Sequence, residues 1–295
     1  MKAIATHSPQ TRLASYLELC KPKVVSLMVF TAIVGMLLAS PGLVPWQPLL
    51  FGTLGIALAA CSAAAINHVL DRRIDAQMRR TRRRPLPTGT LSEAHALTFA
   101  VLLGICSMIV LVGLVNLLTA LLTFTSLIGY AIIYTVFLKH ATPQNIVIGG
   151  AAGAAPPVLG WTAVTGHVDA DALLLFLIIF TWTPPHFWAL AIARRDEYAK
   201  VGVPMLPVTH GEQFTRLHIL YYTILLVLVS LLPYLTGMSG LLYLAGALGL
   251  GGGFMYYAIA LLRSSAPELP MRTFAWSITY LTALFAALLA DHYVF

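Results

Sequence analysis

PLLFGTLGIALAACSAAAINHVLDRRID, residues 48–75, contains the two features that decide the fold of this chain. Residues 48–70 are almost entirely apolar, and about 20 apolar residues form a helix long enough to cross a bilayer. Asn67, Asp71 and Asp75 then follow one another at intervals of four residues. Because residues four apart share one face of a helix, the stretch predicts a membrane-spanning helix with an oxygen-rich face at one end.

The composition of the whole chain is that of a protein surrounded by lipid. Of its 295 residues, 59% are hydrophobic and 10% are charged, whereas a soluble domain carries roughly 25% charged residues. The net charge of +7 could suggest nucleic acid, but in a membrane protein it indicates basic cytoplasmic loops, and we expect no nucleic-acid partner. Three cysteines without a CxxC pair argue against a disulfide frame or a zinc site.

Apolar stretches recur along the chain and predict an all-α integral membrane protein with about nine transmembrane helices. They form a single polytopic domain over 23–292, preceded by a cytoplasmic arm over 1–22. The expected helices cover residues 23–40, 48–70, 95–114, 117–138, 145–164, 171–193, 216–236, 240–262 and 272–291.

The basic residues test this helix count. All 18 Lys and Arg fall in the amino-terminal arm or in the second, fourth, sixth and eighth connections and their flanks. A missed helix would move every later residue to the other side, so the segregation supports nine spans. Since Lys and Arg concentrate on the cytoplasmic side, we expect a cytoplasmic amino terminus and an external carboxyl terminus in a bacterial inner membrane. The long polar connections at about 71–94 and 194–215 are then cytoplasmic, and we place function there.

The spacing of Asn67, Asp71 and Asp75 favours a metal site. Carboxylates near hydrocarbon are costly and usually mark function, and Mg²⁺ takes one or two carboxylates together with substrate phosphate oxygens. The alternative is a solvated helix end on which the two aspartates pair with neighbouring arginines such as Arg72.

Two further clusters lie on the same predicted face. The run RRTRRRPLPTG at 79–89 could hold a diphosphate through bidentate guanidinium contacts, or it could be a topology signal that attracts anionic lipid. The run RRDEYAK at 194–200 offers Asp196 or Glu197 for a second cation and Lys200 for phosphate. Its alternative is an ordinary charged loop.

WTPPHFW at 182–188 lies inside the sixth expected helix. The two prolines should kink that helix and free backbone carbonyls, which protein or a cavity must then satisfy. His186 could face such a cavity, or it could be a structural histidine beside a packing kink.

These residues are similar to a known family. Asn67-x3-Asp71-x3-Asp75 resembles the first acidic motif of the UbiA superfamily of intramembrane prenyltransferases, and further stretches resemble the branch of that superfamily that farnesylates protohaem. These stretches are LCKPKVVS at 19–26, RTRRRPLP at 80–87, NIVIGG at 145–150 continuing to Trp161, PHF at 185–187 and YAKVGVPMLPV at 198–208. The similarity covers about residues 20–290.

The resemblance implies a nine-helix bundle around a lipid-open cavity, Mg²⁺ as cofactor, and farnesyl diphosphate and haem B as substrates. Haem O, formed with addition of water, and diphosphate would be the products. It implies that Asn67, Asp71 and Asp75 act on the metal. The other implied roles are a further metal ligand (Asp196), neutralisation of the leaving group (Arg80, Arg84, Lys200), substrate binding (Tyr198), contact with the haem carboxylates (Lys139 or loop arginines) and contact with haem or water (His186).

Two departures from the superfamily pattern affect these roles. Relatives often have two adjacent acids where this chain has Asn67-His68, and Asp-x3-Asp where it has Asp196-x3-Lys200. The sequence pattern therefore supports the second metal site less strongly than the first.

Two other functions remain open at this point. A sister prenyltransferase with an aromatic acceptor such as 4-hydroxybenzoate would keep the acidic motifs, but the PHF and GVPMLPV stretches disfavour it. A transporter would show paired broken helices at mid-membrane, whereas the charges here crowd one interface. Partners expected beyond the substrates are the lipid bilayer and a haem A synthase or the assembly of a haem–copper oxidase.

Overall fold

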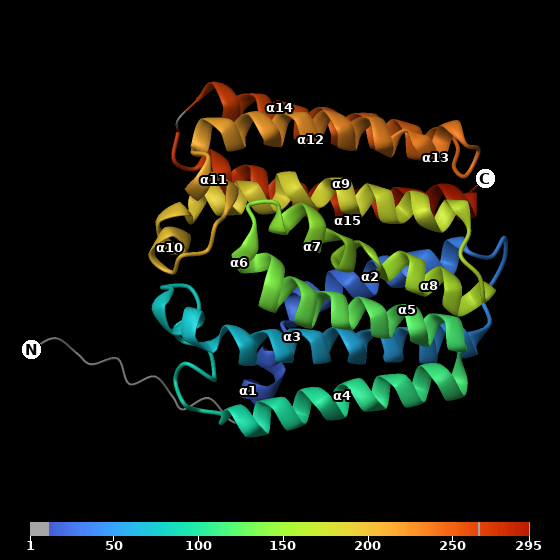
Figure 1. Cartoon of the computed structure of the whole chain (residues 1–295). Helices are drawn as coiled ribbons and strands as arrows, with labels where there is room; N and C mark the ends of the chain where they lie inside the picture. Colours follow the sequence, from blue (N-terminus) through green and yellow to red (C-terminus); the bar gives the residue numbers. More distant parts are fainter. Residues whose placement is uncertain (1–11, 265, 295) are drawn as a thin grey trace, which may run out of the picture.

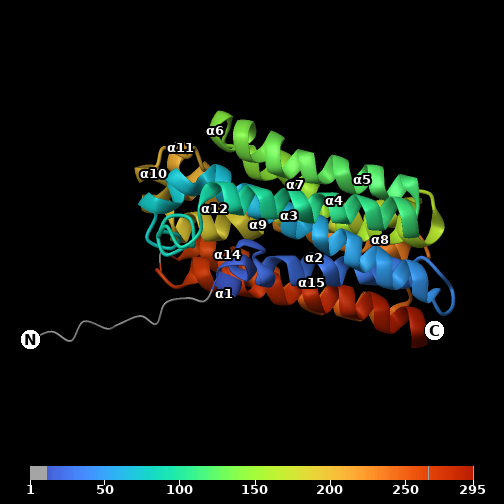
Figure 2. The same ribbon diagram turned by 90° about the horizontal axis from the view of Figure 1, so that it is seen from below.

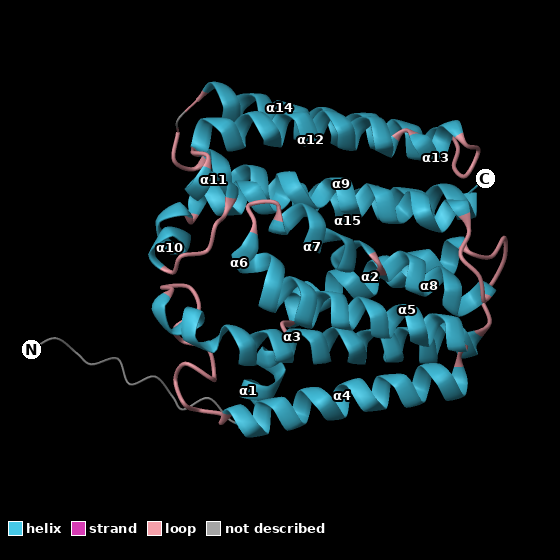
Figure 3. Cartoon of the chain, viewed as in Figure 1, coloured by secondary structure: helices cyan, strands magenta, loops and turns pink. Residues whose placement is uncertain are grey.

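The computed structural model describes residues 12–264 and 266–294, and within these it contains helices and loops without strands (Figure 3). Eight helical segments are long and apolar enough to cross a membrane, and a ninth span results if α1 and α2, bent by 50° to each other, are counted as one. The expectation of an all-α membrane protein with about nine spans is confirmed.

The helices follow one another in the order that the apolar stretches predict. Their bounds are α1 (Arg12–Leu19), α2 (Pro22–Leu38), η1 (Pro48–Gly52), α3 (Thr53–Gln77), α4 (Glu93–Leu114), α5 (Leu117–Ile128), η2 (Gly129–Leu138), α6 (Lys139–Ala141), α7 (Asn145–Ala154), α8 (Pro156–Thr165), α9 (Ala170–Ala193), α10 (Arg195–Lys200), α11 (Leu206–Thr209), α12 (Glu212–Ser230), α13 (Leu232–Leu235), α14 (Leu241–Arg263) and α15 (Leu269–Val294).

The long helices run side by side, and the bundle has two distinct ends. Figure 1 shows α1, α6, α10 and α11 at one end, with α13 and the carboxyl terminus at the other. Figure 2, turned by 90°, shows the same division. The first end, called the basic end below, carries the second, fourth, sixth and eighth connections, which are the ones that hold the basic residues. The structure thus places at one end of the bundle the four connections that the charge pattern assigned to one side of the membrane.

Helix α3 extends beyond the expected span of residues 48–70, as the helical spacing of Asn67, Asp71 and Asp75 predicts. The second connection was expected from residue 71, but α3 continues to Gln77 and the connection starts at Met78. Asp71 and Asp75 are buried on this last part of the helix. Cationic partners from elsewhere in the chain hold them there, so the helix can continue beyond its apolar part.

Two expected spans are less regular than the apolar pattern suggested, and a third, in which two prolines were expected to cause a kink, is a single helix. The fifth is divided at Ala155 into α7 and α8, because Pro156 lacks the amide hydrogen that would continue the helix. The fourth contains a π-helical segment, η2, between α5 and α6. The sixth is one continuous helix, α9, with Pro184 and Pro185 inside it.

The arm expected over 1–22 and the connection expected over 194–215 also contain structure. Residues 1–11 of the arm lie outside the described residues, but residues 12–19 form α1. Two short helices, α10 and α11, occupy the sixth connection, and α12 begins inside its expected range at Glu212.

Small residues bring α2 and α8 close together. A Cβ built on Gly35 would lie 2.2 Å from the Pro157 carbonyl oxygen, and one on Gly160 would lie 1.9 Å from that of Ala32. Glycine is therefore required at both positions, as in close helix pairs of membranes generally. This contact anchors α2, which leads directly to the site described next.

Candidate active site

Three oxygen-bearing side chains of α3 form the centre of the candidate site. Asn67, Asp71 and Asp75 are 3%, 6% and 4% exposed, and the Asn67 side-chain amide donates a hydrogen bond of 2.9 Å to Asp71 Oδ2. Their helical spacing aligns them on one face, as the sequence predicts. They lie in the last turns of α3 before the connection that begins at Met78, at the basic end of the bundle.

Each of these side chains is held by a cation from a different segment. Lys139 Nζ lies 2.6 Å from Asp71 Oδ1, and an Arg84 guanidinium nitrogen lies 2.6 Å from Asp75 Oδ2. The Lys21 ammonium donates a hydrogen bond of 2.5 Å to Asn67 Oδ1. Three cations therefore meet two carboxylates, and the cluster carries an excess of positive charge that suits an anionic ligand. We call these six residues the acidic–cationic cluster.

The backbone around the cluster is built to hold it. Lys21 has φ 49° and ψ 59°, and among the described residues it is the one non-glycine residue with positive φ. A left-handed backbone conformation at a non-glycine residue costs free energy and often accompanies function. Lys21 adopts it at the break between α1 and α2, where its side chain contacts Asn67. Thr81 closes the other side, since its hydroxyl donates to the Asp75 carbonyl oxygen at 3.0 Å.

The π-helical segment η2 also contributes to the cluster. The Asn67 side-chain amide donates to Thr135 Oγ1 at 3.2 Å, and the Thr135 hydroxyl donates to the Tyr130 carbonyl oxygen five residues earlier. A π-helical turn widens the helix and is frequent at functional sites. In this protein it sets Thr135 against Asn67 one turn before Lys139.

The second predicted cluster approaches the first through Glu197 instead of Asp196. Glu197 Oε2 accepts a hydrogen bond of 3.4 Å from the Arg80 backbone amide, and Arg194 lies 3.2 Å from Glu197 Oε1. Tyr198 is buried beside this contact, and its burial raises the pKa of its phenol. The contact ties α10 to the connection that carries Arg84.

Asp196, Lys200 and Arg80 lie outside the acidic–cationic cluster. All three residues are exposed. Within residues 12–264 and 266–294, no three His, Cys, Asp or Glu side chains lie close enough together to hold a metal ion by themselves. Asp196 was expected to serve a second cation, and because α10 turns it toward solvent in this structure, that role stays a prediction.

His186 is packed among rings instead of facing an open cavity. Its imidazole stacks on Trp182 and Phe274, with ring centroids 4.1 and 4.5 Å away, and its Nδ1 lies 2.6 Å from Ser277 Oγ. This environment fits the packing alternative given above. A role toward the acceptor stays a prediction.

Sequence reasoning missed three residues around the cluster. Lys21 entered the sequence analysis only as part of the stretch LCKPKVVS. It precedes Pro22, and because a residue before proline is biased away from helical conformation, its position could have predicted the break between α1 and α2. Thr135 lies in an otherwise largely apolar segment, and no sequence pattern predicted its role. His68 is 1% exposed, and both its ring nitrogens lack a hydrogen-bond partner among the described residues; its place in the acidic motif was the signal.

The residues of the cluster fit a divalent cation bound together with a diphosphate. Two carboxylates and an amide oxygen on one helix face are hard ligands, and Mg²⁺ needs no more from a protein when phosphate oxygens complete its shell. Lys21, Lys139 and Arg84 contact the side-chain oxygens of Asn67, Asp71 and Asp75 in this structure, so their positive charges surround the place where a diphosphate would bind.

A membrane bundle with a buried acidic face and surrounding cations is arranged to hold a metal ion together with an anionic ligand. The chain belongs to the UbiA prenyltransferase family, whose sequence pattern matches residues 28–288. The curated relatives are more specific. Proteins called protoheme IX farnesyltransferase from Nitrosococcus oceani and Methylococcus capsulatus are 64% and 65% identical to it. These alignments cover 96% and 95% of this chain and 95% and 94% of the relatives.

Solved structures agree on the fold. A structure described as digeranylgeranylglyceryl phosphate synthase matches with a TM-score of 0.80 at 20% identity and covers 96% of this chain and 99% of its own. A UbiA homologue from Archaeoglobus fulgidus bound to DMAPP and Mg²⁺ matches with a TM-score of 0.62 at 16% identity, covering 93% of this chain and 99% of its own.

Proposed function

We propose that this protein transfers the farnesyl group of farnesyl diphosphate to a vinyl group of haem B, with addition of water, giving haem O and diphosphate. The observation that carries the proposal is the acidic–cationic cluster, in which Lys21, Lys139 and Arg84 meet Asp71 and Asp75 inside a membrane bundle. The choice of donor and acceptor follows the name of the relatives that are 64% and 65% identical.

The proposal includes Mg²⁺ as cofactor. Asn67, Asp71 and Asp75 would hold the ion, and it would supply Lewis-acid neutralisation of the diphosphate. The Archaeoglobus fulgidus homologue, whose structure contains DMAPP and Mg²⁺, supports this assignment. Asp196 and Lys200 are left at the exposed rim, where α10 would have to move to bring either to a bound diphosphate.

Arg84 and Lys139 neutralise the charge that builds up on the leaving group. Lys21 adds a third positive charge next to Asn67, to which it donates a hydrogen bond. Such electrostatic stabilisation by preplaced cations is strong where water is excluded. The bond between farnesyl C1 and the diphosphate oxygen breaks, and the electron pair leaves with the diphosphate. The vinyl π electrons of haem then form the new bond to C1. Water adds to the carbon next to the porphyrin ring and loses a proton, which leaves a hydroxyethylfarnesyl group.

The remaining residues serve binding. Arg80 belongs to the connection that starts at Met78 and Tyr198 to α10. These two segments meet at the hydrogen bond from the Arg80 amide to Glu197, and together they would close the donor site from outside the membrane. We propose that this end faces the cytoplasm of a bacterial cell, with the carboxyl terminus external, and that haem A synthase or the assembly of a haem–copper oxidase receives the product.

A direct test uses the purified protein with haem B, farnesyl diphosphate and MgCl₂, with products read by mass spectrometry. We expect a species of the mass of haem O, absent when Mg²⁺ is chelated. The variant Asp71→Asn serves as the negative control. A farnesylated product from 4-hydroxybenzoate and none from haem B would contradict the assignment of the acceptor.

A further inference from the structure

A pocket of about 460 Å³ opens beside the acidic–cationic cluster at the break between α1 and α2. Lys21 and Arg84 line it and at the same time hold Asn67 and Asp75. The pocket and the cluster are therefore neighbours that share two cationic side chains. A ligand in the pocket would lie directly next to a donor diphosphate bound at the cluster. We call this space the α1–α2 pocket.

The α1–α2 pocket is amphipathic. Leu17 and Val24, which are 58% and 56% exposed, form part of its lining together with Lys23. Three cations line it against one carboxylate, that of Glu18. An anionic group attached to an apolar body is the chemistry that such a lining suits.

His68 provides the second, independent observation. It lines the α1–α2 pocket, its residue is 1% exposed, and both ring nitrogens lack a hydrogen-bond partner among the described residues. Leaving a buried polar group without a partner is costly, and native structures rarely do so without a reason. An imidazole N–H that donates to an anionic ligand would remove this cost.

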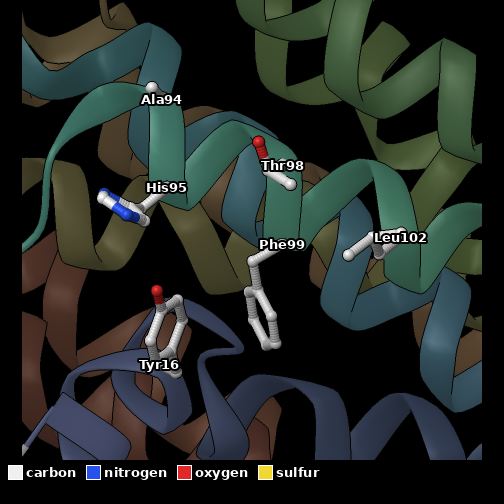
Figure 4. Close-up of a pocket in the computed structure, with 6 residues that line it drawn as sticks. All are labelled: Tyr16, Ala94, His95, Thr98, Phe99 and Leu102. Atoms are coloured by element: carbon white, nitrogen blue, oxygen red, sulfur yellow. The ribbon is translucent and has the colours of Figure 1, made fainter.

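A second pocket on the opposite side of α1 shows the contrast. Tyr16, His95 and Phe99 line it (Figure 4), and its volume is about 350 Å³. There His95 Nδ1 already lies 2.6 Å from Ser92 Oγ, and the Tyr16 and Phe99 rings pack at 4.9 Å. The histidine of this pocket therefore has a polar partner, whereas His68 in the α1–α2 pocket has none among the described residues.

We propose that the α1–α2 pocket binds the carboxylate edge of the porphyrin acceptor, with the His68 imidazole and the Lys23 ammonium as its contacts. This inference rests on the proposed function, since haem B carries two carboxylates on a flat apolar ring. It gives His68 and Lys23 the role expected of Lys139 or loop arginines, since Lys139 lies at the donor site, 2.6 Å from Asp71. The amphipathic lining lets the acceptor enter from the lipid while its carboxylates meet the cations.

The experiment titrates haem B, and separately haem B with both carboxylates methyl-esterified, into the full-length purified protein. Lys23→Gln and His68→Phe should each weaken binding of haem B about tenfold, the effect of one lost hydrogen bond to a charged group. Neither should change binding of the diester, which wild type itself should bind more weakly. His68→Gln, which keeps a donor, should restore part of the loss. Arg83→Gln, an exposed cation outside the pocket, is the matched control.

The outcomes separate this inference from the proposed function. If Lys23→Gln and the histidine variants bind haem B like wild type, or lose as much affinity for the diester, the pocket assignment is overturned while haem O formation still stands. If His68→Phe fails to fold, exposed Lys23 carries the test alone. If Lys23→Gln instead abolishes a preference for phosphatidylglycerol over phosphatidylcholine vesicles, the pocket holds a lipid phosphate and the inference is overturned. Absence of any haem product from wild type would contradict the proposed function itself.

Discussion

At the scale of single residues, the donor site is a set of ion pairs that must exchange partners. The carboxylates proposed to bind a metal are held by Lys139 and Arg84 at 2.6 Å each. A buried carboxylate without a partner would be costly, so these cations keep the site stable when it is empty. The same side chains are then in place for the diphosphate. Stability and catalysis therefore depend on the same residues and can be separated by double substitutions.

Asp71→Asn should lower turnover at least about tenfold, because it removes a charged ligand while keeping the shape. It should also destabilise the protein by about 3–5 kcal/mol, since Lys139 loses its partner in a partly dry site. The double variant Asp71→Asn, Lys139→Gln should regain most of that stability without regaining turnover. Thermal unfolding in detergent and initial rates measure the two effects. Equal stability of the single and double variants would show that the pair does not stabilise the fold.

Substitutions of Lys21 test whether catalysis depends on its left-handed backbone conformation or on its ammonium group. Lys21→Gly accepts φ 49° without strain, and Lys21→Met keeps the side-chain length, but both lose the contact with Asn67. We expect both to lower kcat/KM for farnesyl diphosphate by roughly tenfold, the effect of one charge-assisted contact. If only the methionine variant were impaired, the left-handed backbone alone would be the important feature.

At the scale of elements, the connection from Met78 to Ser92 sorts its arginines by position. Arg84 reaches Asp75, whereas Arg79 and Arg83 are exposed. Arg84→Ala should therefore raise KM for the diphosphate and lower kcat, and Arg80→Ala should raise KM only. Arg79→Ala and Arg83→Ala should change either parameter less than about twofold, because exposed ion contacts contribute little. Steady-state kinetics at saturating haem B measure these effects. Equal small effects at all four arginines would favour a lipid-binding role for the basic run at 79–84.

The contact between α2 and α8 gives a second prediction at this scale. Gly160→Ala would place a methyl group 1.9 Å from a backbone oxygen of α2, which neither helix can avoid without moving. Overpacking of this kind costs about 1–3 kcal/mol or more. Gly153→Ala on α7 has open space around it and is the matched control. A lower midpoint of thermal unfolding for Gly160→Ala alone is expected, and identical midpoints would mean that α2 and α8 separate easily.

At the scale of the whole molecule, the two ends of the bundle predict its orientation in the membrane. Reporter fusions at Gly42, Gly166 and Gly237 should read as external, and fusions at Thr88 and Gly211 as cytoplasmic, since basic loops stay on the cytoplasmic side. The structure places α1, α6, α10 and α11 together at the second group's end (Figure 1). A cytoplasmic signal from Gly166 would contradict both the charge pattern and this arrangement.

The sequence by itself determined the features that depend on local pattern. Runs of about 20 apolar residues form helices in lipid, because a helix satisfies its backbone hydrogen bonds within one segment, so about nine spans and their order could be predicted. The four-residue spacing of Asn67, Asp71 and Asp75 likewise determined that they share one helix face. Loop charge indicated which end they occupy.

Only the tertiary structure decided what surrounds that face. Lys21, Lys139 and Arg84 come from three segments far apart in sequence, and no pattern within a segment reports which cation meets which carboxylate. The same holds for the packing of His186 against Phe274, the contact of Glu197 with the Arg80 amide and the lack of a partner for His68 among the described residues. These features arise from helix packing, which balances close contacts at residues such as Gly160 against the cost of buried charge. They appear only when the helices are assembled.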